Sequence, residues 1–170
     1  SHLHAQIAKI LDALEASGEL DNTYIFFTAD HGLSVGRHGL LGKQSLYDHS
    51  IRVPFMVLGP GVPKGQQVDA DIYLQDVMAT ALDLAKAEKP EYVEFNSLRP
   101  FLDGSQTQSN HEAIYGAYMT LQRMIRKDGY KLIVYPKVPK VLLYDLENDP
   151  QEMHNLAEAP EQAERVQTLF

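Results

Sequence analysis

A short apolar run, TYIFFT at Thr23 to Thr28, constrains the fold more than any other feature of the chain. Its β-branched and aromatic residues are not interrupted by charged ones, so both faces of a strand here would be apolar. Such strands are typical of parallel sheets that helices cover on both faces. We therefore expect an α/β fold in which this run is a central strand of a mixed, mostly parallel sheet flanked by helices. Its parallel neighbour is expected near Phe55 to Leu58.

Periodic apolar residues predict the elements around this strand. Leucine and isoleucine recur at helical spacing before Gly18, which predicts an amphipathic helix over Leu3 to Ser17. A second apolar run, RVPFMVLGPG at Arg52 to Gly61, predicts a strand that ends in a Pro/Gly turn. Tyr73 to Ala85 again carries apolar residues on one helical face, which predicts a second helix.

The pattern changes after residue 110. Three strand-like runs, AIYGAYM, QRMIRKDGYKLIVYP and KVLLYDLEND, are separated by turn signals, and PEQAERVQTLF has helical character. Successive hairpins make antiparallel sheet, so we expect a small antiparallel sheet from about Ile114 to Leu146, followed by a terminal helix. The chain is thus expected to divide into an α/β part at residues 1–110 and a small antiparallel part at residues 111–170.

Composition limits the classes of partner. The 170 residues carry a formal charge of -8, which argues against nucleic acid or an anionic membrane surface as the main partner. The chain has no cysteine, which removes disulfides, thiolate metal sites and a thiol nucleophile. No apolar run approaches the ~20 residues that span a bilayer, so no membrane span is expected.

The loop TADHGLSVGRHGLLGK, which follows the first strand, gathers residues suited to chemistry. Asp30 is a carboxylate at the strand end, a good ligand for a hard divalent cation, and the His31 imidazole can join it. Gly32 lets the chain turn away without a side chain that blocks the site. Lys43 supplies a mobile point charge suited to a tetrahedral oxyanion. A metal and a lysine on opposite sides of a sulfate or phosphate would neutralise its oxygens in the transition state.

A purely structural interpretation of this loop also exists. Strand-Asp-His-Gly is often a tight turn capped by the aspartate, and a single lysine is usually solvated. The combination of Asp30, His31 and Lys43 in one short segment at the carboxyl end of a strand favours the functional interpretation, because ligands bind at that edge in open α/β sheets.

The segment TADHGLSVGRHGLLGKQSLYDHSIRVPFMVLGPGVPKG closely resembles the second conserved block of type I sulfatases, in the alkaline phosphatase superfamily. The resemblance covers nearly the whole chain. The residues before this block match the helix and strand that lead into it, NSLRPFLDG is similar to the segment before the C-terminal subdomain, and YKLIVYP and LLYDLENDPQEMHNLA resemble its hairpin and closing motif. The spacing of Asp30 and His31 from Lys43, with RVP downstream, makes the match specific.

The resemblance implies a role for each matching residue. Asp30 matches a ligand of the active-site calcium, and His31 occupies the next position on the metal side. Lys43 matches the lysine that binds the sulfate oxygens in catalysis. His38 lies in the substrate-facing loop and is expected to bind substrate. Residues 1–110 would then be the C-terminal part of the catalytic domain, and residues 111–170 its small C-terminal subdomain.

The resemblance also implies groups that this chain lacks. Type I sulfatases use a formylglycine made from Cys or Ser in a C/S-x-P-x-R motif, and neither version of that motif occurs here. We therefore expect the C-terminal portion of a sulfuric ester hydrolase, inactive alone. Its partners would be the N-terminal remainder of the same protein, which completes the calcium site, and a sulfated small molecule or carbohydrate. The family resemblance points to a periplasmic or secreted protein.

Two alternatives remain open. One is a phosphoester or phosphonate hydrolase of the same superfamily. Two-metal relatives in that class need another histidine ligand far downstream, and neither His111 nor His154 lies in a glycine-bounded strand-end motif. The other is a non-catalytic sulfatase-like module, against which the intact Asp30, His31 and Lys43 argue.

Overall fold

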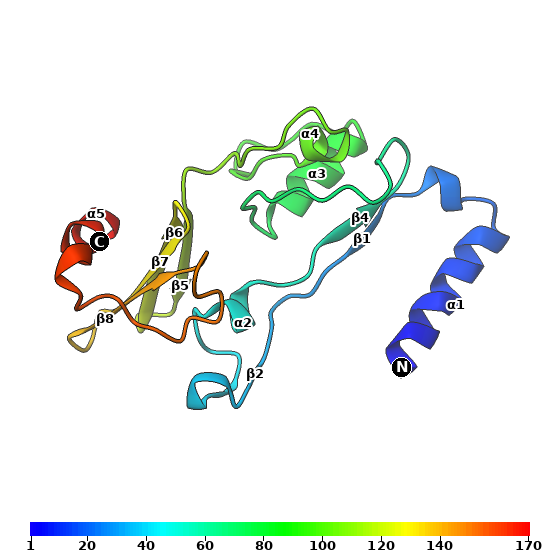
Figure 1. The fold of residues 1–170 in the computed structure, drawn as a ribbon. Coiled ribbons are helices and arrows are strands. Elements are labelled where there is room, and N and C mark those ends of the chain that lie inside the picture. Colours follow the sequence, from blue (N-terminus) through cyan, green and yellow to red (C-terminus); the bar gives the residue numbers. More distant parts are fainter.

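The computed structural model describes all residues, 1–170, and places the helices and strands along an extended body. Helix α1 lies at one end, and the sheet β5–β8 with helix α5 lies at the other (Figure 1). The elements before that sheet are α1 (His2–Ala16), β1 (Ile25–Phe27), β2 (Ser34–Val35), β3 (Leu41–Gly42), α2 (Asp48–Ile51), β4 (Met56–Leu58), α3 (Asp76–Leu84) and α4 (Arg99–Leu102). Short 3-10 turns occupy Leu20–Asn22, Arg37–Gly39 and Pro160–Gln162.

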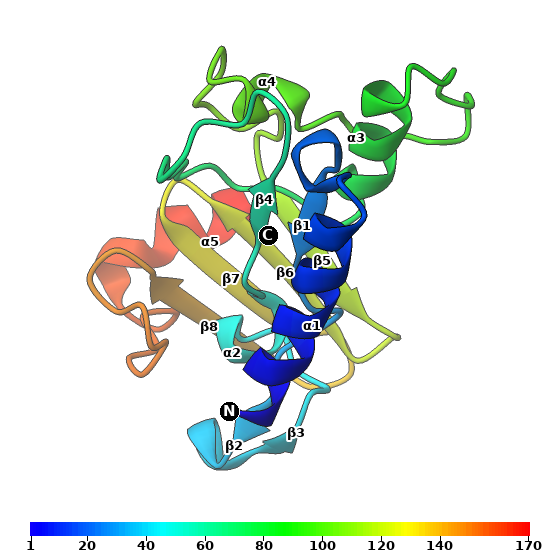
Figure 2. The same cartoon turned by 90° about the vertical axis from the view of Figure 1, so that its right-hand side faces the viewer.

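Helix α1 confirms the first predicted helix. The Ser1 hydroxyl caps its start by accepting a hydrogen bond from the His4 N–H at 3.4 Å, and Gly18 follows its end with a left-handed φ of 77°. No side chain of α1 is buried, and Leu3 and Ile10 remain 61% and 68% exposed. Figure 1 shows the helix apart from the other elements at one end of the molecule, and in Figure 2 it lies in front of them. Its apolar stripe therefore has no partner within the chain.

The first strand is present, but the predicted direction of its neighbour is wrong. β1 and β4 pair antiparallel, with Phe26 opposite Val57. The connection between them turns back through β2, β3 and α2 and returns from the end at which β1 leaves, so β4 runs the opposite way (Figure 1). A parallel pair would need a crossover that carries the chain back along the sheet.

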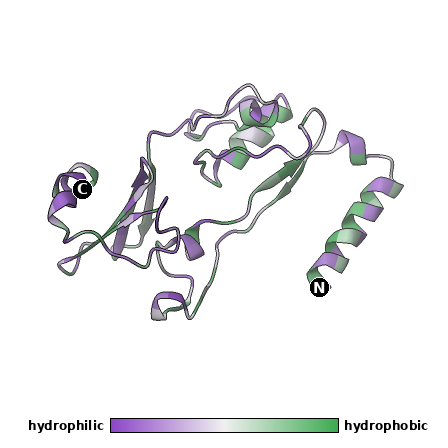
Figure 3. Cartoon of the chain, viewed as in Figure 1, coloured by the Kyte–Doolittle hydropathy of each residue, from purple (hydrophilic) through white to green (hydrophobic).

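The expected mostly parallel sheet is likewise absent from this chain. All three sheets are antiparallel, and β1–β4 is only two-stranded. β1 is half-buried rather than fully buried, and Met56 and Leu58 of β4 are 53% and 58% exposed. Figure 3 shows apolar residues along these strands and on α1, where no other element of the chain covers them. The mixed α/β class is correct, whereas the sheet arrangement is corrected.

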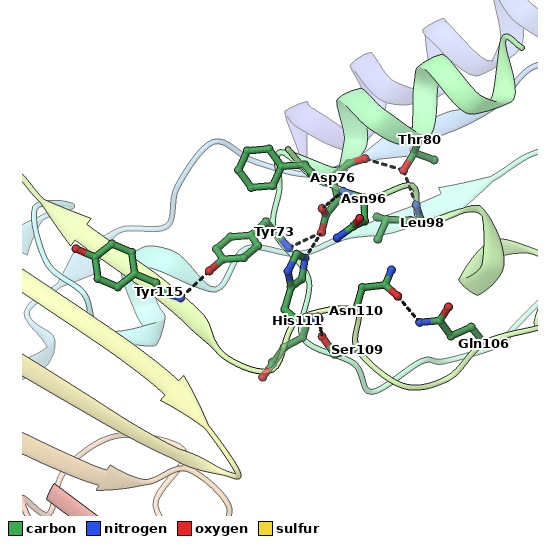
Figure 4. Close-up of polar contacts among 12 residues, drawn as sticks. Tyr73, Asp76, Thr80, Asn96, Leu98, Gln106, Ser109, Asn110, His111 and Tyr115 are labelled. Carbon is green, nitrogen blue, oxygen red and sulfur yellow. Dashed lines mark hydrogen bonds and ion pairs between the residues drawn. The ribbon is translucent and has the colours of Figure 1, made fainter. Parts of the chain in front are cut away.

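Helix α3 is shorter than predicted and begins at a buried acid. The Asp76 side chain is fully buried, and its carboxylate accepts hydrogen bonds from the backbone N–H groups of Tyr73 and Asn96 at 2.8 and 3.0 Å (Figure 4). His111 Nε2 lies 3.2 Å from the same carboxylate. The Tyr73 hydroxyl accepts a hydrogen bond from the Tyr115 N–H at 2.6 Å. These contacts connect the α3 region to the first strand of the C-terminal sheet.

The C-terminal sheet confirms the predicted antiparallel part. Its strands are β5 (Ile114–Tyr118), β6 (Gln122–Lys127), β7 (Tyr130–Tyr135) and β8 (Lys140–Asp145), hydrogen-bonded in chain order. Asp128 and Gly129 join β6 to β7 with φ values of 50° and 77°, the left-handed conformations of a tight hairpin turn. The terminal helix α5 (Ala163–Leu169) follows, and the Arg165 guanidinium lies 3.7 Å from the ring centroid of Tyr130.

The largest apolar cluster joins this sheet to the segment after the glycine-rich loop. Its buried members are Leu46, Tyr47, Met124, Ile133, Leu142 and Tyr144. Two of them, Leu46 and Tyr47, precede α2, so the loop is attached to the sheet through the core. None of the helices is both long and apolar enough to cross a membrane.

We expect Leu143→Ala to lower the free energy of unfolding by about 2–5 kcal/mol, because Leu143 is fully buried in β8 and its truncation leaves a cavity. Leu121, in the turn between β5 and β6, is 40% exposed and supplies a matched control. Leu121→Ala should cost about 0.5 kcal/mol. Urea unfolding measures both, and equal losses would contradict the assignment of the core.

Candidate active site

The glycine-rich loop is held against helix α2 at Gly32, five residues after β1 ends. The Gly32 N–H donates a hydrogen bond to the Ser50 carbonyl at 2.8 Å. A Cβ atom added at Gly32 would lie 2.0 Å from the His49 carbonyl oxygen, far inside van der Waals contact. Glycine is therefore required here by the close approach of two backbones. This contact fixes the backbone position of the two residues before it, Asp30 and His31.

The structure brings together three of the four predicted site residues. Asp30 Oδ2 lies 3.3 Å from His31 Nε2, and Lys43 Nζ lies 2.6 Å from the same nitrogen. The Asp30 side chain is 85% exposed and the His31 side chain 35% exposed, so both are open to solvent in this chain. A carboxylate, an imidazole and an ammonium thus meet at one exposed point.

The hydrogen bonds of His31 determine which nitrogen can bind a cation. His31 Nδ1 lies 2.8 Å from the Gly32 carbonyl oxygen, which can only accept, so Nδ1 carries the proton. In the neutral ring, Nε2 then has a free lone pair, which here accepts a hydrogen bond from the Lys43 ammonium. A carboxylate and an imidazole lone pair on the same side are two suitable donors for a divalent cation.

This donor pair fits part of a metal site. No group of three or more His, Asp or Glu side chains in the chain is arranged to hold a metal ion. Calcium takes ~6–8 ligands, mostly oxygens, so the Asp30 carboxylate and the His31 nitrogen would supply a minority of them. Lys43 occupies the His31 lone pair in this structure, so a cation bound there would displace its ammonium.

The fourth predicted residue, His38, lies in an aromatic stack. Its ring is parallel to that of Tyr47, with centroids 4.0 Å apart and planes 7° apart, and the His49 ring lies 5.6 Å away. His38 Nε2 is buried without a hydrogen-bond partner. The residue adopts a left-handed backbone with φ 54° and ψ 23°. The geometry gives His38 a packing role, and its contact with substrate stays a prediction.

Sequence reasoning did not predict the hydrogen bonds among the polar residues that follow the glycine-rich loop. Ser45 Oγ lies 2.8 Å from Ser50 Oγ and 3.3 Å from His49 Nε2. Burial, followed by the neighbouring His38 and Arg37 side chains, lowers the pKa of His49 below its usual value. His49 therefore favours its neutral form. The only signal in the sequence was two serines and a histidine just after the glycines, which no motif distinguishes from ordinary loop residues.

Comparison with known proteins then decides the family. The family model for N-sulphoglucosamine sulphohydrolase, C-terminal, matches residues 36–170. The chain belongs to the sulfatase family and corresponds to the C-terminal portion of a sulfatase. An arylsulfatase of Clostridium perfringens is 32% identical to this sulfatase chain over 99% of the chain and 36% of the relative. An N-acetylglucosamine-6-O-sulfatase of Bacteroides thetaiotaomicron is 32% identical over 96% of the chain and 32% of the relative.

Solved structures place the fold in the same superfamily. The chain is similar to a protein solved in complex with its substrate D-glucosamine-2-N,6-O-disulfate, with a TM-score of 0.85 and 30% identity. The match covers 96% of this chain and 35% of that one. The chain is equally similar to a phosphonate monoester hydrolase of Agrobacterium radiobacter, with a TM-score of 0.86, 28% identity and coverage of 96% and 36%. The sulfatase chain thus spans about a third of the length of these relatives.

We expect Gly32→Ala to destabilise the protein by about 1–3 kcal/mol, because the new methyl group would overlap the His49 carbonyl. Gly18→Ala is the control. Gly18 has open space around it, and its cost comes only from its left-handed φ of 77°. Gly32 is not in that region, so a larger loss at Gly32 in urea unfolding reports the close contact with α2. An equal or smaller loss would show that the loop is not held there.

Proposed function

We propose that the full-length protein is a sulfuric ester hydrolase, and that this chain contributes the lysine and two metal ligands of its active site. The observation that carries the proposal is the convergence of Asp30, His31 and Lys43 at one solvent-open point, in a chain of the sulfatase family. The N-terminal remainder of the protein would complete the site. The chain alone is proposed to be inactive, because it has no nucleophile of the formylglycine type.

Asp30 and His31 are proposed to hold one side of a calcium ion, Asp30 through its carboxylate and His31 through the Nε2 lone pair. When bound, the calcium ion would draw charge from the sulfate oxygens, and a formylglycine in the remainder of the protein would supply the nucleophile. The Gly32 carbonyl keeps the proton on His31 Nδ1, which leaves Nε2 available. This second contact fixes the orientation of the ring.

Lys43 is proposed to bind the sulfate oxygens that face away from the metal. Its ammonium lies 2.6 Å from His31 Nε2, so a short movement of a flexible side chain would bring it to a sulfate held beside the metal ligands. Its side chain is exposed in this chain and contributes little to the core. A point charge beside the sulfuryl oxygens would stabilise their negative charge as the S–O ester bond breaks and the alcohol leaves.

The substrate is proposed to be a sulfated small molecule or carbohydrate. Two of the similar proteins support a sugar: one is named an N-acetylglucosamine-6-O-sulfatase, and another was solved with a glucosamine disulfate. A periplasmic or secreted location is proposed in turn, supported by the extracellular sulfatase homologue of Drosophila melanogaster, which is 35% identical over 56% of this chain.

We propose that residues 1–110 are the C-terminal part of the catalytic domain and that residues 111–170 are its small C-terminal subdomain.

A second candidate reaction is phosphonate or phosphate ester hydrolysis. It is supported by the similarity to the phosphonate monoester hydrolase, whose fold matches as well as the sulfatases do. Turnover of an aryl sulfate and of the corresponding phosphonate monoester by the full-length protein separates the two. A higher kcat/KM for the phosphonate would replace the sulfatase proposal by this one.

We expect Lys43→Ala in the full-length protein to lower kcat/KM for a sulfate ester by about 10²-fold, because one charge-assisted contact in the transition state is lost. The melting temperature should change little, since Lys43 is exposed. Lys64→Ala, at an exposed lysine remote in sequence from the loop, is the control and should retain wild-type kcat/KM. Near-normal activity of Lys43→Ala, or a loss in proportion to unfolding, would make Lys43 an ordinary surface charge.

A further inference from the structure

The segment that follows Lys43 lies on the C-terminal sheet. Leu46 and Tyr47 are 5% and 8% exposed and pack in the cluster that contains Ile133 of β7. The Leu46 N–H also donates a hydrogen bond to the Gln122 side chain at the start of β6, at 3.2 Å. The backbone that leads out of the site at Lys43 is therefore held by a sheet whose strands begin more than sixty residues later in the sequence.

Beneath this segment lies a buried group of charges. Lys131 of β7 is fully buried, and its ammonium donates hydrogen bonds to Asp48 Oδ1 and, at 2.6 Å, to Glu152 Oε1. Glu152 is 2% exposed, and its second oxygen accepts a hydrogen bond from the Asp48 N–H at 2.7 Å. Arg126 Nη1 lies 3.6 Å from Asp48 Oδ2. Arg126 Nε also lies 3.1 Å from Asp71 Oδ2, and Arg52 Nη1 lies 3.9 Å from Asp48 Oδ2, so the group holds three acids and three bases.

Glu152 also has an uncommon backbone. Its φ of 58° lies in the left-handed region, which a glutamate rarely adopts. Backbone strain of this kind persists where surrounding contacts hold it, and it clusters at functional sites. Here the contacts that hold it are the ammonium of Lys131 and the backbone N–H of Asp48.

Helix α2 connects the buried charges to both halves of the candidate site, the Asp30–His31 pair and Lys43. Asp48 is the first residue of α2, and the Ser50 carbonyl in the same helix accepts the hydrogen bond of the Gly32 N–H. Asp30 and His31 immediately precede Gly32. On the other side, the segment before α2 leads back to Lys43. A shift of α2 would therefore change the position of the metal ligands relative to the lysine.

We propose that Asp48, Lys131 and Glu152 act together as a positioning unit, through which the C-terminal sheet sets the distance between the Asp30–His31 pair and Lys43. The inference rests on the proposed function, in which this distance separates the metal ligands from the lysine that binds sulfate. None of the three residues touches the point where Asp30, His31 and Lys43 meet, so their effect is on geometry alone.

Directional contacts distinguish this role from simple stabilisation. Replacement of a complete buried ion group by uncharged side chains removes the desolvation cost of the charges together with their attraction, and with well-packed apolar residues the change is often neutral for stability. The fixed directions of the ammonium N–H bonds are lost in that replacement. Stability and positioning can therefore be separated in one variant that removes the buried ammonium together with both of its carboxylates, since Arg126 keeps Asp71 as a partner.

The test uses the full-length protein with Lys131→Met, Asp48→Asn and Glu152→Gln combined. We expect the melting temperature to stay near that of the wild type, kcat for an aryl sulfate to fall by about 10²-fold, and KM to change little, because a small misplacement of reacting groups has that effect. The increase in melting temperature on addition of calcium should also shrink. Lys140→Met, at an exposed lysine of β8, is the control and should leave all three readouts unchanged.

A folded triple variant with wild-type kcat and calcium response would overturn the proposal. Should that variant fail to fold, Glu152→Gln alone decides: it keeps an acceptor for the Asp48 N–H and removes one charge, so kcat should fall about fivefold at constant KM. Wild-type kcat in this variant would likewise overturn the proposal. If the wild type turns over no sulfate ester, the proposed function fails, and positioning is judged from the calcium-induced change in melting temperature.

Discussion

The buried ammonium of Lys131, between the carboxylates of Asp48 and Glu152, is the interaction on which the arrangement of the chain depends. It joins a strand of the C-terminal sheet to the short helix that supports the glycine-rich loop. A buried charge is costly unless it is paired and hydrogen-bonded, so this contact fixes distances more strictly than apolar packing does. The exposed site above it needs such support, because Asp30 and Lys43 are themselves free to move in solvent.

The parts of the fold that sequence predicts well are those set by local rules. The turn at Asp128 and Gly129 requires left-handed backbones, which these residue types adopt readily, and the antiparallel sheet around it follows. The meeting of Asp30, His31 and Lys43 was also predictable, since the first two leave a strand end and the glycines keep the loop short. The direction of the β1–β4 pair was not, because an apolar run has the same pattern in either orientation.

Long-range contacts between polar residues were invisible in the sequence. Lys131 lies 83 positions from Asp48 and 21 from Glu152, and a lysine in a strand is ordinarily a solvent-facing residue. The same holds for His38, whose residue type suits a substrate ligand while its ring stacks on Tyr47. In both cases the role of the side chain depends on its neighbours in three dimensions, and neither the periodicity of the sequence nor the spacing of its residues predicts those neighbours.

Glu152 lies late in the sequence, so the ribosome adds it after all the candidate site residues of this chain. Translation produces the loop that carries Asp30 and Lys43 long before it produces the second carboxylate that meets Lys131. The four strands β5 to β8 pair in chain order, so the sheet can form as it emerges, yet its lysine would still face one acid rather than two. A nascent polypeptide that stops short of residue 152 would hold every candidate site residue of this chain without the geometry that makes them a site.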